Sequence, residues 1–114
     1  MPQSSQPPQS SPRVARCECG ALQLTVSVAP VHVHACACTR CQRVSGSAMS
    51  MSAWFPETGV VITGAYSTYF FTAEPAADLM AAFCPRCGGG KFFRTGAYLR
   101  GCIGISVGSF ADPD

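Results

Sequence analysis

Apolar and polar residues alternate along several segments of the chain, which is the pattern of strands with one buried face. In the clearest run, residues 21–28, Leu22 and Leu24 alternate with Gln23 and Thr25. Alternation, or a concentration of β-branched and aromatic residues, predicts further strands at residues 31–34, 49–55, 60–63, 66–72 and 103–107. We expect the two strands that flank Gly64 to meet at a turn.

Helical periodicity is scarce in this sequence. Residues 76–83 are the only helix-like stretch, and a turn or so of helix is expected after Cys38. Five or six short strands, glycine-rich connections and no long amphipathic helix predict an all-β domain of antiparallel sheets, held partly by metal.

The first residues differ in composition from the rest of the chain. Residues 1–12 contain only Met, Pro, Gln and Ser. Such a segment cannot bury enough apolar surface to offset the entropy lost on ordering. We therefore expect a disordered tail at residues 1–12 and a single domain at residues 13–114, whose cysteines, described below, indicate zinc binding.

Composition narrows the class of protein. The 114 residues are 47% hydrophobic and 12% charged, so one domain with a core of fair size can form. No stretch offers the roughly 18 apolar residues of a membrane span, and the N-terminus lacks the features of a secretory signal. We expect a cytoplasmic protein without a membrane partner. Because the formal charge is only +2 and the basic residues are scattered, we also expect no binding to nucleic acid.

Eight cysteines carry the candidate chemistry, and a reducing compartment favours zinc over disulfides. They fall into CEC at residues 17–19, CACTRC at residues 36–41, CPRC at residues 84–87, and Cys102. The CPRCG segment is a zinc knuckle, since its spacer lets both sulfurs face one ion and Gly88 permits the left-handed turn. A closed site needs four ligands, and Cys17 and Cys19 are the natural second pair.

The middle group offers three thiolates and leaves a tetrahedral ion one ligand short, which is the arrangement of a catalytic zinc. Water, a substrate thiol, His32 or His34, or Cys102 could complete it. If Cys102 does so, the eight cysteines form two closed sites and nothing reacts. A buried free cysteine in the final strand is at least as good an interpretation of Cys102.

Several other residues are assigned to structure rather than chemistry. His32 and His34 are interpreted as hydrogen-bonded strand histidines, although either could be a base or ligand. Four side chains of one segment are interpreted as core, with a pocket wall as the alternative: Met49, Met51, Trp54 and Phe55. The pair Phe92 and Phe93 is also interpreted as core.

The cysteine motifs, together with QRVSG at residues 42–46 and VGSFADP at residues 107–113, resemble the glutathione-dependent formaldehyde-activating enzyme family. That family also includes the domain of centromere protein V. The resemblance covers about residues 16–114. It implies a β-tent fold of short curled sheets with two zinc sites, one structural and one associated with activity.

Carried over by motif, the resemblance also implies the ligand sets and the reaction. Cys17, Cys19, Cys84 and Cys87 would hold the structural zinc, and Cys36, Cys38 and Cys41 the open, catalytic one. The family activity is addition of glutathione to formaldehyde, giving S-hydroxymethylglutathione, so the implied class is a carbon-sulfur lyase acting on glutathione and a small aldehyde.

Arg40 and Arg43 flank Cys41, and we expect them to offset thiolate charge or to bind the carboxylates of glutathione, with solvated surface arginines as the alternative. The sequence departs from the family where Ala37 replaces a frequent His and where the chain stops at Asp114. A homodimer would suit the low charge and the exposed strand edges.

Two other functions compete with the enzyme. A non-catalytic zinc-binding module with two structural sites would bind a partner or carry glutathione. A thiol redox switch would need the middle cysteines to react reversibly with oxidant while they release metal.

Overall fold

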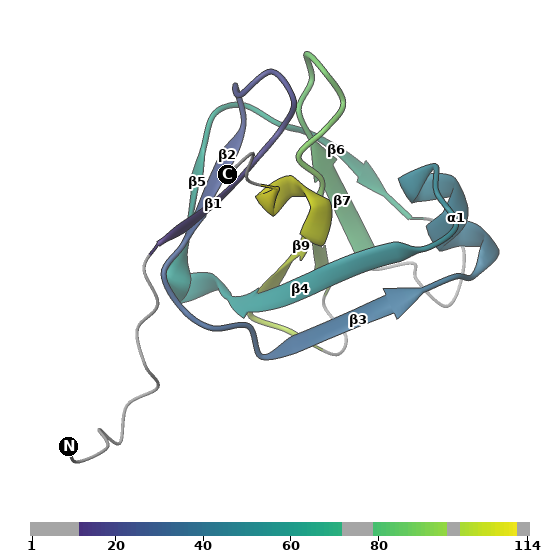
Figure 1. Ribbon diagram of the computed structural model, residues 1–114, viewed down its shortest axis with the longest axis horizontal. Coiled ribbons are helices and arrows are strands. Elements are labelled where there is room, and N and C mark those ends of the chain that lie inside the picture. Colours follow the sequence, from purple (N-terminus) through teal and green to yellow (C-terminus); the bar gives the residue numbers. More distant parts are fainter. Residues whose placement is uncertain (1–11, 72–78, 96–98, 112–114) are drawn as a thin grey trace.

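The computed structural model describes residues 12–71, 79–95 and 99–111, and within them nine strands form two antiparallel sheets (Figure 1). The smaller sheet has the order β1-β2-β5 and the larger one the order β3-β4-β9-β8-β7-β6. The small sheet consists of β1 (Arg13–Arg16), β2 (Gln23–Val26) and β5 (Val60–Thr63). The large sheet consists of β3 (His32–Cys36), β4 (Ser50–Pro56), β6 (Ser67–Phe70), β7 (Leu79–Phe83), β8 (Phe92–Thr95) and β9 (Cys102–Ser106).

One short α-helix, α1 (Thr39–Ser45), and two 3-10 turns, η1 (Glu57–Gly59) and η2 (Val107–Phe110), complete the described elements. Figure 1 shows the small sheet and the pair β6 and β7 rising from the layer of β3 and β4, with η2 between them. The all-β class and the tent-like arrangement of short sheets are as predicted, and so is the helical turn after Cys38. Among the described residues, no helix has the length and apolar character that crossing a membrane requires.

The main core lies between the two sheets. Leu22 and Leu24, next to or within β2, are fully buried, and so are Phe92 and Ile105 of the large sheet. Their burial removes apolar surface from water, which is the principal driving force of folding. The alternation in residues 21–28 therefore identified the buried face of β2 correctly.

A second, smaller apolar cluster covers the other face of the large sheet. Its buried members are Trp54, Phe71, Ala81 and Phe93. Trp54 lies against Gly104 of the neighbouring strand, and its indole Nε1 donates to the hydroxyl of Ser52 at 3.0 Å. Val44 packs against this cluster, so the apolar side of α1 packs on the large sheet.

Three strands depart from the prediction. Residues 79–83 form β7 rather than a helix, because this segment pairs with both β6 and β8 and buries Met80, Ala81 and Ala82. Tertiary pairing outweighs the local helix preference of alanine and methionine. The strands β1 and β8 were not predicted. The two strands expected on either side of Gly64 are present as β5 and β6, and the chain passes from the small sheet to the large one between them. Residues 76–78 and 1–11 lie outside the described residues.

The core assignments are partly correct. Trp54, Phe55 and the pair of phenylalanines in β8 are buried, as predicted. The core assignment of Met49 and Met51 is wrong, because their side chains are 43% and 50% exposed. They flank Ser50, the first residue of β4, and line a surface hollow.

Candidate metal centre

The four cysteines of the two outer motifs come together, although the sequence separates them by up to seventy residues. Their ligand atoms all lie within 4.8 Å of one another, and we call them the four-cysteine cluster: Cys17, Cys19, Cys84 and Cys87. The Sγ atom of Cys19 lies 3.6 Å from that of Cys17 and 3.7 Å from that of Cys84. Tetrahedral bonds of about 2.3 Å place sulfurs roughly 3.8 Å apart, so these residues fit a zinc ion.

Two tight turns bring these sulfurs together. Gly20, with φ 81°, ends the first turn, and Gly88, with φ 78°, ends the second. Each turn is closed by a backbone bond, because the amide of Gly20 donates to the carbonyl of Cys17 at 3.1 Å and that of Gly88 to Cys84 at 2.8 Å. Only glycine adopts this left-handed conformation without strain.

Backbone amides support the sulfurs as thiolates. The N–H of Leu22 donates to Cys17 Sγ at 3.2 Å, and the N–H of Arg86 donates to Cys84 Sγ at 3.3 Å. The amides of Cys19 and Gly89 lower the pKa of Cys87 to about 6. Hydrogen bonds to the charged form favour the thiolate, which is the form that binds metal.

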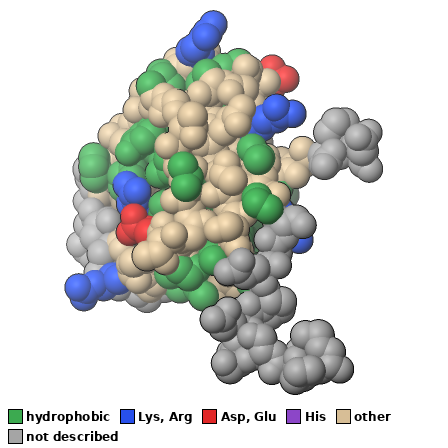
Figure 2. Space-filling model, turned by 90° about the vertical axis from the view of Figure 1, so that its left-hand side faces the viewer, with side chains coloured by type: hydrophobic (Ala, Val, Ile, Leu, Met, Phe, Trp, Pro, Cys, Tyr) green, Lys and Arg blue, Asp and Glu red, His purple; other side chains and the backbone are tan. Residues whose placement is uncertain are grey.

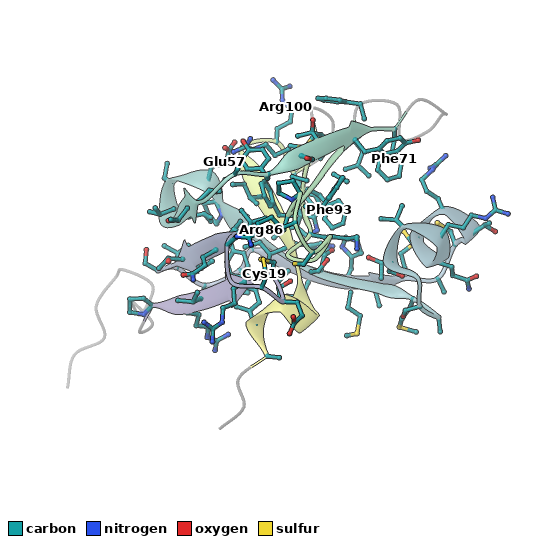
Figure 3. The ribbon with its side chains drawn as sticks, turned by 90° about the horizontal axis from the view of Figure 1, so that it is seen from above. Cys19, Glu57, Phe71, Arg86, Phe93 and Arg100 are labelled. Atoms are coloured by element: carbon teal, nitrogen blue, oxygen red, sulfur yellow. The ribbon has the colours of Figure 1, made fainter. Side chains whose placement is uncertain are left out.

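The four-cysteine cluster is closed to its surroundings on one side. Cys17 and Cys84 are buried, and both belong to the main core. A Cβ atom on Gly90 would lie only 3.0 Å from Cys17 Cβ, so the chain after the knuckle packs closely against the cluster. Figure 3 shows Cys19 and Arg86 near the centre of the view, well away from α1. Four ligands and partial burial are the properties of a structural zinc site.

The three remaining candidate ligands gather where β3 passes into α1. Cys36 ends β3, Cys38 is the N-cap of α1, and Cys41 lies in its first turn. Their ligand atoms lie within 4.8 Å of one another, and we call them the cysteine triad. No His, Asp, Glu or further Cys of the described residues joins them. Within the described part of the chain, the triad therefore offers a metal ion three ligands.

The cap geometry and the mutual charge of the triad explain its electrostatics. The N–H of Cys41 donates to Cys38 Sγ at 3.4 Å, and this bond, with the neighbouring thiols, lowers the pKa of Cys38 to about 7. Burial, together with the sulfurs of Cys36 and Cys38, raises the pKa of Cys41 to about 12. Three thiolates so close together repel one another, and a divalent cation among them removes that repulsion. The triad thus fits zinc by its donors and by its charge.

The other groups that could have completed the triad do not reach it. Cys102 is half-buried in β9 and packs against the second apolar cluster, in agreement with its interpretation as a core residue. His34 lies nearly parallel to Trp54, with ring centroids 6.5 Å apart, and its Nδ1 is buried without a hydrogen-bond partner. The hydrogen-bonded role predicted for His34 is therefore wrong for this atom. Burial, and next the charge of His32, lowers the pKa of His34.

The two arginines beside Cys41 differ in their surroundings. The guanidinium of Arg40 lies over the ring of Phe71, 5.8 Å from its centroid, and thus joins α1 to the end of β6. Phe71 lies on the side of the molecule nearest α1 in Figure 3. Arg43 is exposed in the last turn of the helix. Both stand on the helix that carries Cys41, and the backbone amide of Arg40 also bonds to Cys38 of the triad.

Charged side chains do not gather into a patch on the face drawn in Figure 2, where Lys and Arg are scattered among apolar and neutral groups. The sequence analysis overlooked Ser45, Ser50 and Lys91, which line a hollow of about 350 Å³. The alternation of Ser50 and Ser52 in β4 was the available signal, since both occupy the sheet face of Cys36.

Comparison with known proteins places this arrangement in a family. No curated protein matches the chain. The family model described as glutathione-dependent formaldehyde-activating enzyme matches residues 12–114, which contain both cysteine groups. The chain therefore belongs to the glutathione-dependent formaldehyde-activating enzyme family.

Proposed function

We propose that this protein is a zinc-dependent, glutathione-binding carbon-sulfur lyase that adds the thiol of glutathione to formaldehyde or another small aldehyde. The observation that supports this best is the cysteine triad, with three sulfurs within 4.8 Å of one another and no fourth donor in the described part of the chain. Membership of the glutathione-dependent formaldehyde-activating enzyme family supports this reaction class. The four-cysteine cluster has the structural role in this proposal.

The reaction requires a thiolate at neutral pH, where a free thiol with a pKa of about 8.5 is mostly protonated. Zinc held by Cys36, Cys38 and Cys41 would supply that deprotonation. The glutathione sulfur attacks the carbonyl carbon, a C–S bond forms, and the C=O π electrons move to oxygen, which takes a proton from water. The product is S-hydroxymethylglutathione, and no oxidant or reductant is needed.

Formaldehyde is too small to need a shaped pocket, so the chain's main task is to bind glutathione. Arg40 and Arg43 are proposed to bind its carboxylates, because a guanidinium pairs with a carboxylate through two parallel hydrogen bonds. Replacing both by Gln should weaken glutathione binding and leave the zinc content unchanged. Unchanged glutathione binding would remove both residues from the site.

The same chemistry suggests the protein's surroundings. All eight cysteines are free thiols, which a reducing compartment preserves for metal binding, so we propose a cytoplasmic location. Glutathione is abundant there. A homodimer, in which exposed strand edges are covered, remains a proposal that sedimentation would test.

The test of the proposal is the rate of the reaction, because glutathione and formaldehyde also combine without a catalyst. Exchange NMR with ¹³C-labelled formaldehyde measures the interconversion of the free aldehyde and the adduct at equilibrium. The zinc-loaded chain should accelerate exchange, the Cys36→Ser variant should not, and Cys102→Ala, which is outside both clusters, should match the wild type. Wild-type chain with two firmly bound zinc ions, no glutathione and no acceleration would favour the alternative, a non-catalytic zinc-binding module.

A further inference from the structure

A hollow of about 350 Å³, with a mixed polar and apolar lining, lies where α1 ends, β4 begins and β8 begins. Gly90 and Lys91, on one side of it, adjoin the four-cysteine cluster. Two placements put its other side near the cysteine triad. Ser50 is the direct cross-strand partner of Cys36, so both side chains stand on the same face of the sheet, with Cβ atoms about 5 Å apart. Ser45 follows Cys41 by four residues in α1, and residues at that spacing share one face of a helix.

The hollow combines one cation with several hydroxyl groups. Lys91 is half-buried at its edge, and its Nζ donates to the carbonyl of Gly88 at 3.4 Å, which leaves two of three donor hydrogens for a ligand. The hydroxyls of Ser50, Ser106 and Ser109 also face the hollow and make no hydrogen bond within the described residues. Among the residues that the structure describes, no acidic one lines the hollow. A ligand with a carboxylate and amide groups suits this lining.

The apolar part of the lining consists of exposed methionines. Met49 and Met51 are 43% and 50% exposed, although methionine side chains are usually withdrawn from water. Flexible thioether side chains of this kind are common at binding surfaces, where they adapt to the shape of a ligand. A volume of about 350 Å³ is sufficient for a small molecule, whereas a folded partner would need a much larger surface.

We infer that this hollow, with Lys91 as its cation, binds a carboxylate of the peptide part of the thiol substrate while the thiol lies at the cysteine triad. The inference rests on the proposed function and deepens it, because it makes Lys91 a specificity-determining residue. It predicts that anionic peptide thiols are preferred over small neutral thiols. The helix arginines and Lys91 would then bind opposite ends of a substrate that carries two carboxylates.

The test separates the peptide part of the ligand from its sulfur. S-methylglutathione keeps both carboxylates but has no thiol, so it reports on the hollow without any bond to the triad. We expect zinc-loaded wild-type chain to bind S-methylglutathione in calorimetry, Lys91→Gln to bind it about tenfold more weakly, and Lys91→Arg to recover most of the affinity. Arg100→Gln is the matched control, because Arg100 is an exposed cation that points away from the ribbon (Figure 3) and should leave binding unchanged.

Two further measurements distinguish the inference from the function on which it rests. Cys36→Ser should keep its affinity for S-methylglutathione, and 2-mercaptoethanol should bind wild type and Lys91→Gln equally. Equal affinity of wild type and Lys91→Gln for both S-methylglutathione and glutathione would overturn the inference alone. S-methylglutathione binding could depend on Lys91 while Cys36→Ser binds glutathione and 2-mercaptoethanol as tightly as wild type does. In that case the inference about the hollow stands and the proposed reaction is refuted.

Discussion

The two cysteine clusters contain the same kind of ligand but differ in how the fold surrounds them. The four-cysteine cluster joins two distant turns, and two of its members belong to the main core. The cysteine triad comes from one continuous segment at the end of β3 and the start of α1, and none of its members is fully buried. A metal that ties distant segments together stabilises the fold, whereas a metal on one segment contributes little to it and remains accessible to a ligand.

Electrostatics sharpen the same contrast. In the four-cysteine cluster, amides support sulfurs on both turns, as the bonds from Leu22 to Cys17 and from Arg86 to Cys84 illustrate. In the triad, the amides of Cys41 and Arg40 both support the same sulfur, Cys38, whereas burial and the neighbouring sulfurs raise the pKa of Cys41. We therefore expect the first cluster to retain an ion more firmly than the triad, which the proposed function gives an open fourth position.

The largest effect is expected from breaking the four-cysteine cluster. Cys84→Ser should unfold the domain, because structural zinc contributes roughly 10–16 kcal/mol of apparent binding energy, about as much as the whole stability of a small domain. Circular dichroism and zinc content would measure the loss. A variant that keeps its thermal transition with one zinc fewer would show that this cluster does not support the fold.

Breaking the triad should abolish activity and spare the fold. Cys36→Ser should bind one zinc instead of two and lose the acceleration of adduct formation, while its stability changes by less than about 2 kcal/mol, since the residue is half-exposed at the end of an edge strand. Thermal unfolding beside zinc analysis provides the measurement. Global unfolding of this variant would contradict the division of roles.

Substitution of a glycine near each cysteine cluster should have a smaller effect on stability. Gly90→Ala should destabilise the domain by about 1–3 kcal/mol, because φ is 69° and the new Cβ would press on Cys17 at 3.0 Å. Gly46→Ala has the same backbone strain, with φ 66°, but open space around it, and should cost only about 1 kcal/mol.

The two glycine variants should also differ in which cluster loses zinc affinity. Because Gly46 caps α1, its variant should weaken zinc binding at the triad more than at the four-cysteine cluster. The variant of Gly90 should do the reverse. Chelator titrations that follow each zinc would reveal the order, and identical responses of the two variants would argue against separate surroundings.

The smallest effect is expected at Cys102. Cys102→Ala should retain both zinc ions and lose about 1 kcal/mol of stability, because a half-buried sulfur leaves the second apolar cluster. Zinc analysis of the purified variant is the check. Loss of a zinc ion would make Cys102 a ligand and close the triad.

The sequence alone was sufficient where a local pattern coincided with a buried face. The alternation around Leu22 and Leu24 predicted β2, and the cysteines that the motifs singled out do gather into two clusters. Local pattern failed where long-range pairing decided the outcome. Residues 79–83 are rich in alanine and methionine, which favour helix, yet β6 and β8 on either side make them a strand.

The candidate site shows the same division. Spacing predicts which cysteines within one motif lie together, since cysteines two or three residues apart can reach one ion. The place of Cys102 and the exposure of Met51 could not be predicted, because they depend on which sheet face is covered and how far the cover extends. The hollow beside the triad likewise depends on Lys91 and Ser50, which are distant in sequence and meet only through the order of the large sheet.

The most direct test of the two-cluster account is a native mass spectrum of the zinc-loaded chain, recorded during titration with glutathione and then with a competing chelator. We predict two zinc ions per chain, one added glutathione that Cys36→Ser cannot bind, and release of the triad zinc well before the other. Two zinc ions that leave together, with no glutathione bound at any concentration, would contradict the account.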